Sequence, residues 1–256
     1  MNLVRAVPAE NTSTVTAPCS KRAVESLHRV SPHIERPVVH VVAAAVIDAA
    51  GRVLIAQRLP GKHLAGGWEF PGGKLDSGED RRVGLARELR EELGITISTP
   101  RPLIRVRHAY DYGEVLIDMW VVRHYDGEPR GLDGQRLNWC TQEELEATEL
   151  LPADGPIVAA LRLPERLTQV STSYYAVSDL FGADAGGRLR GVFCAGMVDA
   201  MAGSDAGADF LVMRNGLPHT EITSICELVP VPVYAQGLRL EEAWGFGATG
   251  IHEIGS

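Results

Sequence analysis

The chain has 256 residues, 45% of them hydrophobic and 23% charged, which is the composition of a globular protein with one large or two modest domains. Its formal charge of −8 and isoelectric point near 5.5 argue against general affinity for nucleic acid or anionic membranes. No apolar run approaches a membrane span, no signal-peptide pattern is visible, and the scattered cysteines predict free thiols in a cytoplasmic protein.

The N-terminal part of the chain divides into an expected tail and a first pair of strands. Residues 1–36 are rich in Ser, Thr, Pro and Ala and lack a sustained apolar period, so we expect a disordered tail with a short helix around Ala23–Val30. Two β-branched runs, Val38–Ile47 and Val53–Ala56, flank an Asp-Ala-Ala-Gly turn. This arrangement predicts a hairpin at the start of the ordered chain.

A helix is predicted from about Asp80 to Leu93, after a loop punctuated by Gly and Pro. Gly94 supplies the expected C-terminal stop. The residues expected on the buried stripe, three and four positions apart, are Val83, Ala86, Leu89 and Leu93.

Further elements complete a first domain, expected to span residues 37–165. Two strands are predicted at Leu103–Ala109 and Val115–Val122, a short strand at Trp139, and a helix at Gly155–Leu163. Strands mixed with helices predict an α+β fold.

From residue 170 to residue 256 the chain alternates short apolar strands with helices, which predicts parallel pairing in a small α/β region. The expected strands are residues 174–179, 208–214, 232–237 and 250–255. The expected helices are Gly191–Met201, Glu221–Leu228 and Leu240–Trp244.

Three carboxylates on one turn of the predicted helix raise a chemical question. Glu88, Glu91 and Glu92 lie on neighbouring helical positions, where like charges repel unless a cation sits among them. Hard oxygen donors at one spot suit Mg²⁺ or Mn²⁺. An isolated cluster of this kind is more often a solvated face paired with arginines, here Arg87 and Arg90.

The cluster belongs to a longer pattern. Gly73, five residues, Glu79, seven residues and then the run from Arg87 to Ile95 match Gly-x5-Glu-x7-Arg-Glu-aliphatic-x-Glu-Glu-x-Gly-aliphatic at every specified position. This pattern is the Nudix box, so the chain resembles Nudix hydrolases, over residues 38 to about 163 and most closely in the MutT branch. The resemblance implies a Nudix α/β/α sandwich with a mixed sheet. It also implies Mg²⁺-dependent cleavage of 8-oxo-dGTP to 8-oxo-dGMP and pyrophosphate, a sanitation of the nucleotide pool that serves DNA replication and repair.

The resemblance assigns roles to individual residues. Glu79 is expected to hold the Arg87 guanidinium, which fixes the loop against the helix. The catalytic residues that it implies are Glu79, Arg87, Glu88, Glu91 and Glu92, and the implied metal ligands are Gly72, Glu88, Glu91, Glu92 and Asp133. The implied substrate-binding residues are Arg58, His63, Phe70, Pro71, Gly72, Gly73, Lys74 and Asp154. Taken singly, His63 could be a surface histidine, Asp154 a helix cap, and Phe70 part of the core.

One of these positions departs from the family pattern. Asp154 stands where the MutT branch has a base-reading asparagine, and an ionised carboxylate only accepts hydrogen bonds. Asp154 could therefore donate to O6 of 8-oxoguanine only when protonated. The alternatives are CTP or dCTP, and a dinucleoside polyphosphate suggested by Tyr110 and Tyr112. A non-catalytic nucleotide sensor is a further alternative, but such a module is expected to have lost box carboxylates, and none is lost.

The C-terminal residues resemble a truncated thiamine phosphate synthase/TenI barrel. A full (β/α)₈ barrel needs about 200 residues, which is far more than this region contains, so we expect a partial barrel without thiamine phosphate synthesis. A partial barrel exposes strand edges. We therefore expect the region to pair with itself, with another chain or with the Nudix domain, and homodimerisation is the working hypothesis.

Overall fold

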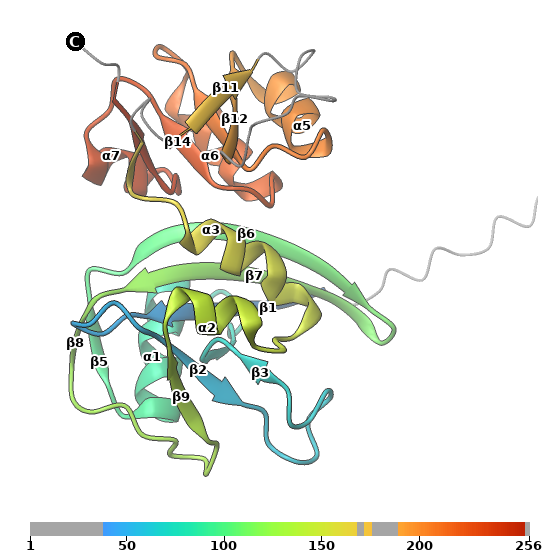
Figure 1. Ribbon diagram of the computed structural model, residues 1–256, viewed down its shortest axis with the longest axis vertical. Coiled ribbons are helices and arrows are strands. Elements are labelled where there is room, and N and C mark those ends of the chain that lie inside the picture. Colours follow the sequence, from blue (N-terminus) through green and yellow to red (C-terminus); the bar gives the residue numbers. More distant parts are fainter. Residues whose placement is uncertain (1–37, 168–171, 176–188, 254–256) are drawn as a thin grey trace, which may run out of the picture. The chain divides into compact units, whose positions relative to one another are not determined.

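The computed structural model describes residues 38–167, 172–175 and 189–253 (Figure 1). Its first sheet has the strand order β4-β1-β7-β6 and is mixed. Strand β1 (Val38–Val46) runs parallel to β7 (Gly113–Val122), which pairs antiparallel with β6 (Arg101–Tyr110). Strand β4 (Gly72–Lys74) runs antiparallel to β1. This sheet confirms the predicted strand pair after residue 100, and it leaves β6 at the edge.

Helix α1 (Arg81–Leu93) lies where the sequence predicts it. Asp80 is its N-cap and accepts hydrogen bonds from the backbone of Arg82 and Val83, and Gly94 ends it at a φ of 71°. The predicted stripe is partly wrong, because the Val83 side chain is 60% exposed and Ala86 is half-buried. The buried residues are Gly84, Leu85, Leu89 and Leu93.

The two strands of the predicted N-terminal hairpin are present, but they belong to different sheets. Strand β2 (Val53–Gln57) meets the end of β1 in a single bridge between Ile47 and Val53, and β2 belongs to another sheet, with the order β3-β2-β9. Because the chain crosses from one sheet to the other, the turn joins two layers of a sandwich. The remaining elements of this half are β3 (Trp68–Glu69), β5 (Thr96–Ser98), β8 (His124–Asp126), β9 (Leu137–Cys140), α2 (Gln142–Ala147), a 3₁₀ turn (Pro152–Asp154) and α3 (Gly155–Leu161).

The C-terminal region, defined here as residues 166–253, forms a six-stranded parallel sheet with the order β10-β15-β14-β13-β12-β11. Its strands are β10 (Arg166–Leu167), β11 (Thr172–Tyr175), β12 (Leu189–Cys194), β13 (Phe210–Met213), β14 (Val233–Ala235) and β15 (Gly250–His252). Its helices are α5 (Met197–Asp205), α6 (His219–Leu228) and α7 (Leu240–Gly245). Parallel pairing is confirmed. The predicted helix at Gly191–Met201 is wrong, because its first half is strand β12.

This sheet must be curved. Six strands about 4.8 Å apart would place the edges of a flat sheet about 24 Å from each other. The edge strands β10 and β11 are separated by only four residues of sequence, and the five peptide steps from Leu167 to Thr172 span at most about 17 Å. The edges therefore approach one another, as in a barrel. Gly191 makes room inside the curve, because a Cβ there would lie 2.3 Å from the Phe210 ring.

Two further expectations concern the chain's environment. Cys140, Cys194 and Cys226 are free thiols, as the sequence predicts, while Cys19 and the expected Ala23–Val30 helix lie outside the described residues. Among the helices of the described residues, none is long and apolar enough to cross a membrane.

Candidate active site

A cavity of about 650 Å³ opens between β1, the β2–β3 loop, β4, α1 and the β6–β7 hairpin. Its lining includes the glycine turn with Glu88 and Glu92, and also Arg58, Glu69 and Asp154. This volume lies in the range of small-molecule sites.

The glycine turn allows the chain to press against the helix. A Cβ on Gly73 would lie 2.1 Å from Oε2 of Glu88, and one on Gly72 would lie 2.1 Å from the carbonyl oxygen of Val42. Gly72 also has a φ of 152°, which L side chains rarely adopt. Only glycines let this turn and the Glu88 carboxylate occupy one corner of the cavity.

The three box carboxylates are placed differently. Glu88 and Glu92 line the cavity, whereas the Glu91 side chain is 60% exposed and its Oε2 accepts a hydrogen bond from Arg87 Nη1 at 3.3 Å. Burial raises the pKa of Glu92 to about 7, with Lys62 lowering it and the Glu88 charge raising it. In the described part of the chain, no three acidic, histidine or cysteine side chains converge as a preformed metal cluster. The expected convergence of all three carboxylates is therefore not seen.

Arg87 is held by Glu79 as the box predicts. Its Nε and Nη2 donate to the two carboxylate oxygens of Glu79 at 2.9 and 2.8 Å, and Nη1 donates to Glu88 at 2.9 Å. Nη2 also donates to the Lys74 carbonyl at 3.1 Å. The hydrogen bonds from Arg87 lower the pKa of Glu79 to about 2, so this carboxylate is ionised at neutral pH. The clamp ties the glycine turn, the loop and the helix together.

Arg58, Glu69 and Asp154 form a buried polar floor in the same cavity. Arg58 Nη1 donates to Glu69 Oε2 at 2.6 Å, and Asp154 is 5% exposed. Asp154 Oδ2 and Arg58 Nε are buried, and neither has a hydrogen-bond partner in the described residues. Burial raises the pKa of Asp154 to about 8, with the Glu69 charge raising it and Arg58 lowering it. Asp154 is therefore a neutral acid at pH 7, with atoms available to a ligand.

Aromatic rings flank the mouth of the cavity. The His63 ring lies edge-on to Tyr112 at 4.3 Å and to Tyr110 at 5.9 Å, and the two tyrosine rings are stacked at 5.2 Å. Phe70 also lines the cavity, although its side chain is 4% exposed and belongs to the core. Flat rings beside a polar floor suit a nucleobase.

Some predicted residues lie elsewhere, and some cavity residues were missed. Pro71 is buried, and its carbonyl accepts from Ala44 N–H at 2.9 Å, while Asp133 is exposed, and neither lines the cavity. Glu69 and Lys62 line it but were not predicted. The signal for Glu69 was a charged residue inside the aromatic stretch Trp68–Phe70.

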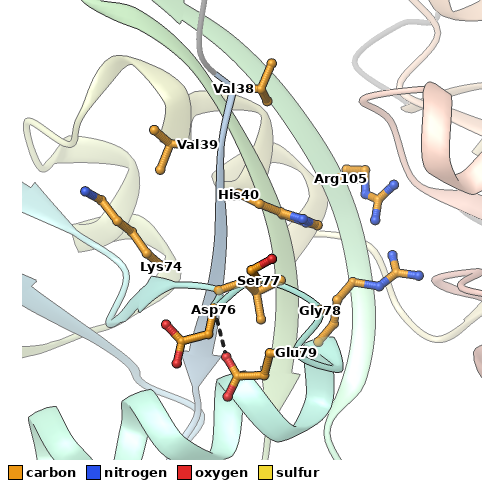
Figure 2. Close-up of a pocket in the computed structure, with 11 residues that line it drawn as sticks. Val38, Val39, His40, Lys74, Asp76, Ser77, Gly78, Glu79 and Arg105 are labelled. Carbon is orange, nitrogen blue, oxygen red and sulfur yellow. Dashed lines mark hydrogen bonds between the residues drawn. The ribbon is translucent and has the colours of Figure 1, made fainter.

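A second hollow, also of about 650 Å³, lies beside the loop between β4 and α1 (Figure 2). His40 and Arg105 stand on its sheet side, and the loop closes with a hydrogen bond from Asp76 N–H to Glu79 Oε2 at 3.1 Å. Lys74 borders both hollows. Only the first contains Glu88 and Glu92, so the first is the candidate active site.

The residues of this corner fit a divalent cation. Glu88 and Glu92 provide hard oxygen donors, and the Glu88 charge disfavours ionisation of Glu92. A cation between them would reverse that effect, and Gly73 keeps the space beside Glu88 free of a side chain. Glu91 lies on the same helix with an exposed side chain.

Comparison with known proteins places the chain in a family. The NUDIX domain model matches residues 42–160. The CTP pyrophosphohydrolase of Escherichia coli K12 is 37% identical over 119 residues, which is 46% of this chain and 88% of that protein. The 8-oxo-dGTP diphosphatase of Haemophilus influenzae is 32% identical over 128 residues, 50% of this chain and 94% of that protein. A solved MutT structure, from work on the Aliivibrio salmonicida and Vibrio cholerae proteins, is 31% identical with a TM-score of 0.43, covering 49% of this chain and 97% of that one.

The chain therefore belongs to the Nudix hydrolase family, with MutT-like relatives. Members of this family act on phosphoric anhydrides and generally need a divalent metal ion.

Proposed function

We propose that the chain is a Mg²⁺-dependent nucleoside triphosphate pyrophosphohydrolase whose preferred substrate is 8-oxo-dGTP. The observation that carries the proposal is a single cavity lined both by box glutamates with the glycine turn and by a buried, partly unpaired polar group of residues. Such a cavity suits a ligand with a phosphate chain and a base. The relatives named 8-oxo-dGTP diphosphatase support the same assignment.

At the phosphate end, the reaction adds water to the triphosphate and breaks one bridging P–O bond, giving nucleoside monophosphate, pyrophosphate and a proton. Bound Mg²⁺ would neutralise phosphate charge and lower the pKa of water. Glu88 and Glu92 would hold it, completed by Glu91. Lys74 lines the same end and offers a cation to the phosphate oxygens. The Arg87–Glu79 clamp keeps the turn and the helix in register while this happens.

At the base end, Asp154 reads the base as a neutral acid. A protonated carboxyl offers one O–H donor and one carbonyl acceptor. The 8-oxoguanine edge presents N7–H as a donor and O6 as an acceptor, so the two edges are complementary. In this proposal Asp154 supplies the donor and acceptor pair that an asparagine would supply.

Hydrolysis of CTP or dCTP is the second candidate, favoured by the same residue. Cytosine presents the N4 amino group as a donor and N3 as an acceptor, which also match a protonated Asp154. The E. coli relative is named CTP pyrophosphohydrolase.

A substrate panel tests both candidates. The full chain with Mg²⁺ would be assayed on 8-oxo-dGTP, dGTP, dCTP, CTP and diadenosine tetraphosphate, and the products would be identified. We expect the highest kcat/KM for 8-oxo-dGTP, with monophosphate and pyrophosphate as products. A preference for CTP selects the second candidate, and release of orthophosphate alone contradicts both.

Glu92→Gln tests the metal corner. Loss of one carboxylate charge at the cation should lower kcat about a thousandfold, equivalent to about 4 kcal/mol, while the fold is kept. Glu128→Gln, which changes an exposed glutamate paired with Arg130, is the matched control. Near-normal turnover of Glu92→Gln would remove this residue from the mechanism.

A further inference from the structure

The described residues of the C-terminal region contribute nothing to the candidate active site. Every residue that lines the cavity lies between Val39 and Asp154. Residues 36–256 nevertheless form one compact unit, so the region has contacts with the Nudix half that need an explanation.

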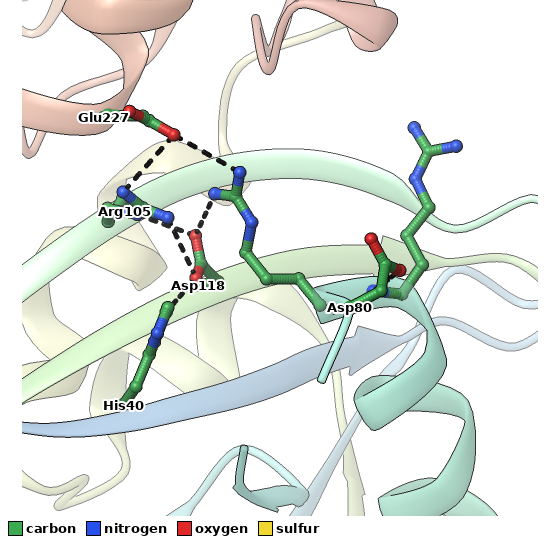
Figure 3. Close-up of polar contacts among 7 residues, drawn as sticks. His40, Asp80, Arg105, Asp118 and Glu227 are labelled. Atoms are coloured by element: carbon green, nitrogen blue, oxygen red, sulfur yellow. Dashed lines mark hydrogen bonds and ion pairs between the residues drawn. The ribbon is translucent and has the colours of Figure 1, made fainter. Parts of the chain in front are cut away.

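One set of contacts consists of ion pairs in which the C-terminal region provides the negative charge and the Nudix half provides the positive charges. Glu227 of α6 accepts from Arg81 Nη2 at 3.3 Å and lies 3.8 Å from Arg105 Nη1 (Figure 3). Both arginines also bind Asp118 of β7, which is 6% exposed, and His40 binds the same carboxylate. Two guanidinium groups thus share one buried carboxylate, and Glu227 provides the second negative charge. Arg81 is the first residue of α1, so this contact reaches the start of the box helix.

A second contact is a buried hydrogen bond to a strand edge. Strand β6 is the last of its sheet, and no strand among the described residues pairs with the backbone groups of its outer edge. The hydroxyl of Thr249 donates to the carbonyl of Leu103 at 2.6 Å, next to the β6 irregularity between Pro102 and Ile104. The same hydroxyl accepts from Val233 N–H at 3.1 Å. Because Leu103 and Thr249 are 4% and 6% exposed, water is not available to replace this bond.

A third contact covers the beginning of the same strand. The Arg101 guanidinium lies 5.0 Å above the Trp244 ring, and Trp244 Nε1 donates to the Thr249 carbonyl at 3.3 Å. The connector residue Glu165 pairs with Arg101 as well. Charge, aromatic surface and a buried hydroxyl therefore meet β6 within a few residues.

We propose that the C-terminal region is an intramolecular cap on edge strand β6 and on the start of α1. Its partner is the Nudix half of the same chain. Arg81 of α1 and Arg105 of β6 contact Glu227, Arg101 contacts Trp244, and the Leu103 carbonyl accepts from Thr249. The cap occupies the sheet edge that a second copy could otherwise pair with. The homodimer expected from the sequence is the competing arrangement.

The test measures amide hydrogen exchange on the full chain. Thr249→Val keeps the side-chain shape and removes the hydroxyl that bonds the Leu103 carbonyl. We expect exchange of the backbone amides of Arg101 and of residues 103–105 to become about tenfold faster, since a buried hydrogen bond is lost. Thr220→Val, an exposed threonine on α6, is the matched control and should leave β6 unchanged.

The outcomes are distinct. Faster exchange in β6 for Thr249→Val but not for Thr220→Val supports the cap, as does a monomer by light scattering. Unchanged exchange in β6 overturns it, because the region would then be a separate tethered unit, and a dimer that protects β6 also overturns it. Should Thr249→Val fail to fold, Glu227→Lys gives the same readout, with Glu241→Lys as its control.

Discussion

At the scale of single residues, the base end of the cavity is governed by two carboxyl groups that share one guanidinium. Arg58 donates a hydrogen bond to Glu69, and its charge also acts on Asp154, whose Oδ2 has no hydrogen-bond partner in the described residues. Burial raises the pKa of both acids, and it raises that of Asp154 to about 8. The pair therefore holds a proton at neutral pH, on the residue that we propose reads the base.

Asp154→Asn is expected to flatten the pH profile of kcat/KM for 8-oxo-dGTP. In the wild type, kcat/KM should fall above about pH 8 as Asp154 loses its proton and its donor, whereas an amide donates at every pH. Profiles of both proteins between about pH 6 and pH 10 make the measurement. The same inflection near pH 8 in both proteins would show that Asp154 does not donate to the base.

The proton on Asp154 also makes the free energy of unfolding depend on pH, with a sign that follows from its pKa. The pKa of Asp154 is raised from its ordinary value of 3.8 to about 8 in the folded protein, so the folded state binds the proton more tightly than the unfolded chain does. The resulting stabilisation is fully present below pH 3.8 and is lost as pH rises through about 8. The asparagine variant lacks this slope.

At the scale of elements, α1 is defined by its two ends. Asp80 accepts from two backbone N–H groups at the start, and Gly94 adopts the left-handed conformation at the end. The box glutamates lie in the last two turns of this helix. Fixed ends keep these turns in place beside Gly73.

Asp80→Ala should lower the free energy of unfolding by about 1 kcal/mol, because two N–H groups lose their acceptor. Urea denaturation of the full chain measures the change. Ser77→Ala, an exposed serine in the same loop, is the control and should change it by less than about 0.5 kcal/mol. Equal effects of the two substitutions would show that the cap does not stabilise the helix.

Local patterns explain which elements could be predicted. The box, the N-cap and Gly94 lie within a few residues of one another, so spacing alone places α1. The stripe was assigned to Val83 because helical periodicity fits it as well as Leu85, and only the position of the sheet decides between them. Strand β12 was read as helix because Gly, Val, Phe and Cys in a short run fit either element.

At the scale of the whole molecule, Asp118 is a junction of four elements. Its carboxylate accepts from Arg105 Nε at 2.8 Å and from Arg81 Nη1 at 3.1 Å, and His40 completes the set. Burial alone would raise the pKa of Asp118, but the hydrogen bonds and charge of Arg105 lower it. Strands β1, β6 and β7 and helix α1 therefore meet at one ionised group.

Asp118→Asn should lower the free energy of unfolding by about 3 kcal/mol, because the largely buried Arg105 guanidinium and the partly exposed Arg81 guanidinium lose their counter-charge. Chemical denaturation of this variant is compared with that of Glu114→Gln on the same strand. Glu114 pairs with the exposed Arg107, so its loss should cost less than about 1 kcal/mol. A small effect of Asp118→Asn would mean that water or a rearranged side chain replaces the carboxylate.

The residues of the candidate site that belong to the Nudix box could be predicted from the sequence. The residues that distant segments of the chain bring into the site could not. Gly73, Glu79, Arg87, Glu88 and Glu92 come together through one loop and one helix. Glu69 and Asp154 come from separate parts of the chain, and no spacing rule reports that they share Arg58. Whether Asp154 carries a proton follows from burial, which a sequence does not display.

The short connection between β10 and β11 limits how far apart the two edges of the C-terminal sheet can lie. Its length, more than any side chain, obliges the two outermost strands to turn towards each other. Residues inserted at this place would let the edge strands β10 and β11 move apart and would expose their edges. The same insertion at an exposed loop tip would leave the two edge strands near one another. Tolerance to insertion in this region therefore depends on the length of the connection between β10 and β11.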